Sequence, residues 1–170
     1  MPTSYVSSVV SGLGELAAER GDTTLATRLL ETSAEMSRSV GDPCATARAL
    51  LGSALVTSRT EPALAAEFLA EALTLQVEVG AILGVAEGLE VSAWIFGDRG
   101  ELLRATKLLV AAQGLRDAAG AVRSVWRRER CEETFEAARV GLGDERYAAA
   151  VAEGKTATWE QAVRTALAES

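Results

Sequence analysis

Histidine is absent from the 170-residue sequence. It is the commonest general base in enzymes, it activates serine and cysteine nucleophiles, and it ligates many protein-bound metals. Its absence argues against catalysis, so we expect a protein that is not an enzyme, with no catalytic residues, no metal site and no cofactor. Carboxylate pairs such as Glu67 and Glu71 lie at helical spacing, which is typical of a solvated helix face.

Cysteine and positive charge are also scarce. The two cysteines, Cys44 and Cys131, form no Cys-x-x-Cys pair, and the N-terminus carries no apolar signal sequence, so we expect a reducing, cytoplasmic setting. Seventeen basic residues face 24 acidic ones, and the net charge of −7 argues against nucleic acid as a direct partner. No apolar run approaches the roughly 20 residues that a membrane span needs. We therefore expect no membrane association.

Aromatic residues and prolines are few, which favours helices. Aromatics make up 5% of the chain and only three prolines occur, whereas 48% of residues are hydrophobic. Most of these are Ala, Leu and Val, and the composition predicts an all-α fold. The pairs Gly21-Asp22 and Gly41-Asp42 each have the form of a helix stop followed by a helix cap, and Pro43 and Pro62 suit the first position of a helix.

An internal repeat with a period of about 39 residues organises residues 1–120. The pair Leu13-Gly14 recurs as Leu51-Gly52, whereas Leu89-Glu90 replaces it in a third copy. The motif Ala-x-x-x-Leu recurs at Ala26–Leu30, Ala65–Leu69 and Ala105–Leu109. Small and large residues at such positions are what the two helices of a tetratricopeptide-type hairpin need where they cross. We therefore predict three tetratricopeptide-like helical hairpins, stacked as a solenoid.

The first helix of this array is expected over residues 4–20. Its apolar residues advance by three or four positions, and we predict that they turn toward the core. The predicted inward face consists of Val6, Val9 or Val10, Leu13, Leu16 and Ala17.

The period is lost after Gly120. We interpret residues 121–170 as C-terminal capping helices of the same domain, because a solenoid needs atypical elements to cover its last apolar face. Helices are expected over residues 123–140 and 144–153, with Gly154 ending the second. A final helix should begin after Thr158, because Thr158 and Gln161 have the spacing of a capping box.

The tail from Gly143 to Val163, GDERYAAAVAEGKTATWEQAV, resembles the C-terminal end of a family of large bacterial regulators. These are LuxR-type and antibiotic-pathway activators, in which a signal-transducing (STAND) ATPase module precedes tetratricopeptide-like repeats. The resemblance extends through Arg104–Arg116, RATKLLVAAQGLR, and more loosely to the N-terminus. The chain departs from the family where Val122–Trp126 replaces a proline-bearing loop and Val151 replaces an aromatic residue. It also has no phosphate-binding loop and no basic helix-turn-helix.

What the resemblance implies is the sensor and interaction arm of such a regulator. Three functions stay open on this basis. The first is a non-catalytic module that binds a protein or peptide in a bacterial regulatory pathway, with an ATPase or regulator module as one candidate partner. The alternatives are a small-molecule effector-sensing arm of a transcriptional regulator, and a self-association module that forms a homodimer.

Trp94 heads the first group of candidate binding residues. It lies off the apolar stripe of its helix, and the first helices of stacked hairpins line the concave surface of a solenoid. With Val91 and Glu90 it could therefore line a binding groove. The alternative is that Trp94 packs against the next hairpin.

A cluster of four arginines, Arg123, Arg127, Arg128 and Arg130, forms the second group together with Trp126. Its binding candidates are Arg123, Arg127 and Arg130, which could hold an acidic peptide or a phosphate. The alternative is that nearby acidic residues neutralise these arginines through pairs along one helix. The acidic residues in question are Glu129, Glu132 and Glu133.

Overall fold

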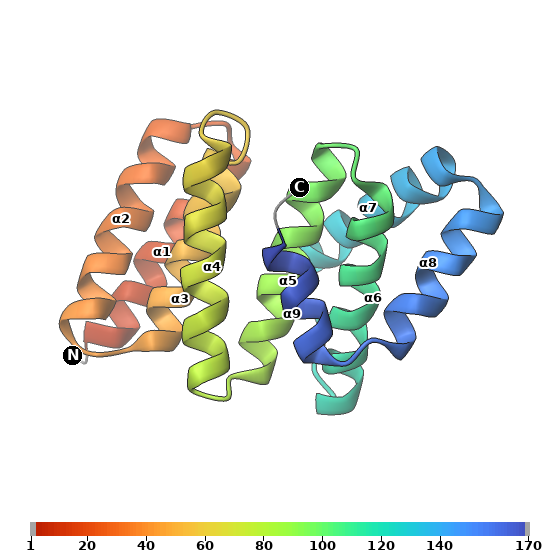
Figure 1. The fold of residues 1–170 in the computed structure, drawn as a ribbon. Coiled ribbons are helices and arrows are strands. Elements are labelled where there is room, and N and C mark those ends of the chain that lie inside the picture. The colour runs from red at the N-terminus through yellow and green to blue at the C-terminus, as the bar shows by residue number, and fades with distance from the viewer. Residues whose placement is uncertain (1–2, 169–170) are drawn as a thin grey trace. The chain divides into compact units, whose positions relative to one another are not determined.

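The computed structural model describes residues 3–168, and over this range the chain forms nine α-helices and no strand (Figure 1). The predicted all-α class is confirmed. The chain divides into two compact units, residues 1–84 and residues 85–170. This division falls within one helix and does not test the predicted boundary between hairpins and cap at residue 120, which stays a prediction. Between residues 3 and 168, no helix has the length and apolar composition needed to cross a membrane.

Unit 1 contains four complete helices, arranged as two hairpins. They are α1 (Thr3–Glu19), α2 (Thr23–Ser39), α3 (Pro43–Thr57) and α4 (Pro62–Glu78). Helix α1 packs on α2, α3 packs on α4, and α2 packs on α3. The side chains of Asp22 and Asp42 accept hydrogen bonds from the backbone N–H groups of Leu25 and Ala45, at 3.0 and 2.9 Å, and so cap α2 and α3 as predicted.

The repeated Leu-Gly pair has a packing reason in unit 1. A Cβ atom on Gly14 would lie 2.8 Å from Cγ of Leu30, and one on Gly52 would lie 2.6 Å from Cδ2 of the same leucine. Leu30, from α2, is fully buried, so its side chain lies close against both α1 and α3. A Cβ atom at either position would force the Leu30 side chain to shift, which supports the predicted role of small and large residues at helix crossings.

The predicted inward face of α1 is wrong, apart from Ala17. The side of α1 that is buried carries the small residues Ser7, Ser11, Gly14 and Ala17. Small residues allow α2 to approach closely, and the hydroxyl of Ser33 in α2 donates a hydrogen bond of 2.8 Å to the carbonyl oxygen of Ser7. The larger predicted core residues are exposed or half-buried; they are Val6, Val9, Val10, Leu13 and Leu16.

Unit 2 begins within α5 (Ile82–Asp98), and α6 (Leu102–Ala119) is its central helix. The tail forms α7 (Val125–Leu142), α8 (Asp144–Thr156) and α9 (Trp159–Leu167), each of which packs on α6. The capping box that starts α9 is confirmed, because Thr158 N donates to Gln161 Oε1 at 2.8 Å and Gln161 N donates to Thr158 Oγ1 at 3.3 Å.

Helix α8 does not end at Gly154 as expected but continues to Thr156. Gly154 is buried, and a Cβ atom there would lie 2.9 Å from the carbonyl oxygen of Lys107 in α6. The glycine therefore permits close packing of α8 on α6, and it lies within the last turn of the helix rather than after its end.

Candidate functional site

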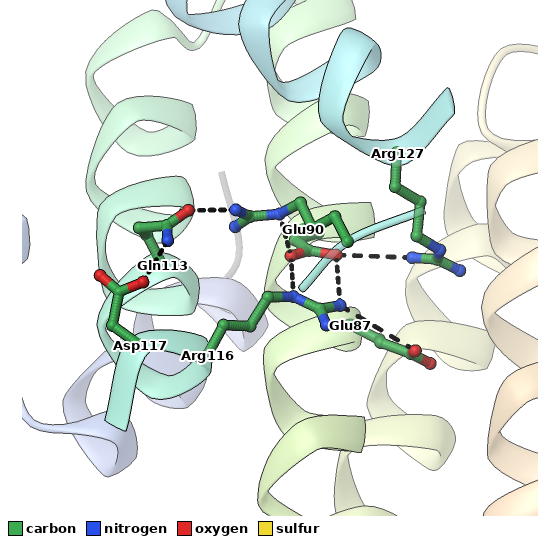
Figure 2. A network of polar contacts seen from close by, with 7 residues as sticks. Glu87, Glu90, Gln113, Arg116, Asp117 and Arg127 are labelled. Atoms are coloured by element: carbon green, nitrogen blue, oxygen red, sulfur yellow. Dashed lines mark hydrogen bonds and ion pairs between the residues drawn. The ribbon is translucent and has the colours of Figure 1, made fainter. Parts of the chain in front are cut away.

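The two predicted groups of binding residues meet in one cluster inside unit 2. Glu90 and Trp94 come from α5, and Trp126 and Arg127 come from α7. Figure 2 shows the guanidinium groups of Arg116 and Arg127 pointing toward Glu90 from α6 and α7. We call Glu90 and its three arginines, Arg116, Arg127 and Arg123 from the segment before α7, the Glu90 cluster.

The Glu90 carboxylate is fully buried and has three arginine partners. Arg116 approaches it with two nitrogens, Nε at 2.6 Å from Oε1 and Nη2 at 3.0 Å from Oε2. Arg123 Nε donates to Oε1 at 2.6 Å, and Arg127 Nη1 lies 3.5 Å from Oε2. Charged groups removed from water in this way need paired, hydrogen-bonded partners, and here the partners tie α5 to α6 and α7.

Positive charge exceeds negative charge in the Glu90 cluster. The side chains of Arg116, Arg123 and Arg127 are only 6%, 9% and 11% exposed. A second carboxylate, Glu87, reaches Arg116 at 4.0 Å. The hydrogen bond to Glu90 raises the pKa of Arg116 above its ordinary value, against the opposing effect of burial. Arg116 therefore stays charged, and the cluster depends on Glu90 for its closest negative charge.

Glu90 occupies a distinctive position in the repeat. It occupies, in the third copy, the position that is Gly14 in the first copy and Gly52 in the second. Those two glycines leave room for the side chain of Leu30. A site that accepts an apolar side chain in two copies thus holds a buried carboxylate in the third. The sequence showed this departure as a degenerate copy, but it did not show which arginines surround it.

The two tryptophans pack together beside the Glu90 cluster. The ring centroids of Trp94 and Trp126 are 5.6 Å apart, with planes inclined by 51°. The guanidinium carbon of Arg127 lies 5.5 Å from the first ring and 5.0 Å from the second, within the range of a cation–π contact. Arg127 is thus held by both the carboxylate and the aromatic rings.

Burial separates the candidate residues into two classes. Trp94 is 1% exposed, Val91 is 2% exposed and Glu90 is fully buried, so these side chains do not lie open on a groove. Trp126 is half-buried, and Arg130 is 35% exposed. The alternative that Trp94 packs within the protein fits its position, and a binding role for these residues stays a prediction.

The expected neutralisation of the arginines by nearby acidic residues is half right. Arg128 pairs with Glu132 at 3.8 Å, and Arg130 pairs with Glu133 at 3.5 Å, although Arg130 also reaches Asp98 of α5 at 2.9 Å. Arg123 and Arg127, in contrast, have Glu90 as their carboxylate partner, from a helix more than 30 positions away in the sequence. The expectation is wrong for these two, because the carboxylate that they contact is Glu90 of α5 and not one of the acidic residues near them in the sequence.

The chemistry available to the Glu90 cluster is electrostatic. Cys131, a buried residue of α7, lies in the electrostatic field of the cluster, and its thiol pKa is raised by burial and by the Glu90 carboxylate, with Arg123 acting in the opposite direction. A protonated, buried thiol is a poor nucleophile. Among residues 3–168 there is also no group of three His, Cys, Asp or Glu side chains suited to hold a metal ion.

A second candidate surface, on α1, was missed at the sequence level. Tyr5, Val9 and Leu13 are 72%, 63% and 49% exposed, and Leu16 continues the same line along the helix. We call these four residues, with Val6, the α1 stripe. The sequence feature that could have indicated this exposure is the row of small residues at positions 7, 11 and 14. Helix α2 can approach α1 more closely on that row than on the larger side chains of the stripe.

The repeat makes the exposure of the α1 stripe informative. The positions in α3 that correspond to Val9 and Leu13 are Ala47 and Leu51, and they are 0% and 1% exposed. The face that the second hairpin buries is therefore open to solvent in the first. An exposed line of large apolar side chains of this kind is typical of a surface that another protein covers.

No family model matches the chain, and the searches of curated proteins and of solved structures also found no match. Its function therefore has to be inferred from the geometry of the two surfaces described above.

Proposed function

We propose that this chain is a non-catalytic helical-repeat module that binds a protein partner through the α1 stripe. The observation that carries the proposal is the contrast between the two hairpins. Val9 and Leu13 are exposed, whereas their repeat equivalents in α3, Ala47 and Leu51, are buried. Leaving several large apolar side chains in water on one line is unfavourable, and a partner that covers them recovers that free energy.

The repeat also indicates what kind of partner fits. Helix α3 is covered by the helices of its own hairpin and of the hairpin before it. A helix or helical hairpin is therefore the element that the α1 stripe is shaped to receive. Full burial of a Val or Leu side chain contributes about 1.5–3 kcal/mol. Covering the exposed halves of Val9, Leu13 and Leu16 would therefore contribute roughly 3 kcal/mol to the free energy of binding. That is enough to change an affinity by about a hundredfold.

The wider context of the proposal is the regulator family that the tail resembles. We propose that the hairpins form a tetratricopeptide-like array and that the partner is a helical part of a regulator, such as its ATPase module. The repeat period and the Gly143–Val163 tail support this identification of the partner class. The stripe itself requires only that the partner presents an apolar helix.

Site-specific photo-crosslinking in cells of the source organism tests the proposal. A photoreactive phenylalanine analogue is placed at Val9 and, as a matched control, at Val140, a valine near the end of α7 that is 75% exposed. We expect one discrete adduct from position 9, mapping to an apolar helix of another protein, and none from position 140. The adduct should disappear when Leu16→Glu puts a charge on the stripe.

Three results would contradict the proposal. One is the absence of any discrete adduct at position 9, and another is an equal yield at position 140. The third is an adduct between two copies of this chain, which would assign the stripe to self-association instead.

A further inference from the structure

A cavity of about 320 Å³ lies within unit 2, between α6, α7, α8 and the start of α9. Its volume is at the lower end of the range for small-molecule sites, about 300–1,000 Å³. Apolar side chains form much of its lining, including Val110 and Leu115 from α6 and Phe135 from α7, with Trp159 from α9. This composition suits the apolar body of a small organic molecule.

Two glycines shape the cavity. Gly114, an exposed residue of α6, lines the cavity, and a Cβ atom built on it would meet no atom within 4 Å, so a larger side chain has room there. On the opposite wall, Gly154 lets α8 lie so close to α6 that a Cβ atom there would be 2.9 Å from a backbone carbonyl oxygen. The cavity thus has free space at Gly114 of α6, and it ends at Gly154, where α8 packs closely on α6.

Two charged residues line the cavity; both are exposed, and neither has an ionic partner among residues 3–168. Lys155 lies in the last turn of α8, where the helix dipole favours a positive charge. Asp117 lies in the last turn of α6, where the dipole disfavours a negative charge. Within residues 3–168 no lysine or arginine pairs with Asp117, whose Oδ1 accepts a hydrogen bond of 2.5 Å from Gln113 Nε2.

We propose that this cavity binds a small aromatic or branched aliphatic amine. The ammonium group would lie at Asp117, where it offsets both the unpaired carboxylate and the negative end of α6. The apolar body would fill the space beside Gly114, against Phe135 and Trp159, whose ring faces also attract cations. The site goes beyond the proposed protein interaction and is independent of it, because no residue of the α1 stripe lines the cavity.

The test is an NMR titration of the ¹⁵N-labelled protein with 2-phenylethylamine and, as a branched aliphatic amine, 3-methylbutylamine. Two compounds with a similar aromatic body serve as controls. Phenylacetate carries a negative charge, and 2-phenylethanol is uncharged. The amines should shift the backbone resonance of Gly114, the side-chain amide of Gln113 and the indole resonance of Trp159. We expect 2-phenylethylamine to bind at least tenfold more tightly than phenylacetate.

Two variants separate the shape of the cavity from its charge. Gly114→Leu fills the open space in α6 and should abolish binding while the fold is kept, because leucine is the better helix former. Gly12→Leu, at a glycine of α1 that also has open space around its Cβ position, is the matched control. Asp117→Asn should remove the preference for the amine over the alcohol.

The proposal is overturned if neither amine shifts the cavity resonances at millimolar concentration, or if phenylacetate binds as well as 2-phenylethylamine. Unchanged amine binding by Gly114→Leu would also overturn it. If that variant does not fold, Gly114→Ala takes its place and should weaken binding at least threefold.

Discussion

Replacing Glu90 with glutamine removes the negative charge from the Glu90 cluster and preserves the shape of the side chain. The amide still accepts one hydrogen bond, but it no longer balances the charges of Arg116, Arg123 and Arg127. All three guanidinium groups lie within 3.5 Å of the present carboxylate and are almost fully buried. Breaking a buried ion pair by removing one partner costs about 3–5 kcal/mol.

We expect Glu90→Gln to lower the free energy of unfolding by about 3 kcal/mol, the lower end of that range, because one hydrogen bond is kept. Total stabilities are about 5–15 kcal/mol, so the loss is a large fraction. For a unit of this size the melting temperature should fall by at least about 10 °C.

Urea unfolding followed by tryptophan fluorescence is the appropriate assay. All three tryptophans, Trp94, Trp126 and Trp159, belong to unit 2, so the signal reports on the unit that contains the substitution. Circular dichroism, which detects the helices of both units, shows whether unit 1 unfolds in the same transition.

Glu87→Gln is the matched control. Its carboxylate is 4.0 Å from Arg116 and its side chain is 29% exposed, so solvent screens the pair, and the loss should be about 1 kcal/mol or less. If Glu90→Gln costs no more than Glu87→Gln, the Glu90 cluster does not hold unit 2 together.

Two further predictions concern packing and the buried thiol. Gly14→Ala should destabilise the protein by about 1–3 kcal/mol in thermal unfolding, because the new Cβ atom would lie 2.8 Å from Cγ of Leu30. Gly12→Ala, at a position with open space, is the control and should not destabilise the protein. Equal effects of the two substitutions would contradict the role of glycine in the repeat. A thiol reagent should modify exposed Cys44 quickly and buried Cys131 only on unfolding. Because burial raises the Cys131 pKa above 9.0, the folded state holds that proton more tightly, so its contribution to stability is present below about pH 9 and is lost as the pH rises through the folded-state value. Cys131→Ala should reduce this alkaline loss in urea unfolding at pH 7 and pH 10, and an unchanged loss would refute the assignment.

Helix boundaries were predictable because local chemistry sets them. The aspartates at positions 22 and 42 cap helices through their own side chains, and Thr158 and Gln161 satisfy each other's backbone groups. Gly154 shows the limit of this reasoning. Its sequence signal is the same for a helix stop and for a close crossing, and only the position of Lys107 distinguishes them.

The orientation of α1 and the partners of the arginines could not be read from the sequence. Helix α1 has two faces that could have packed on α2. The face with the small residues around Gly14 is buried, because it lets α2 approach closely, and the face with the larger Val9 and Leu13 is exposed. The pairing of Arg123 with Glu90 depends on how α5 meets α7, which no local pattern encodes. Residues from both predicted groups lie in one cluster, but the sequence did not indicate that the two groups would meet.

The proposed interaction is tested most directly by the affinity of the purified helical segment captured at Val9. Titration calorimetry would compare the unmodified chain with the Leu13→Glu variant. Because Leu13 is already half exposed, the variant should keep its melting temperature while it binds the segment more than about tenfold more weakly. Equal affinity for the two proteins would contradict the assignment of the α1 stripe as the binding surface.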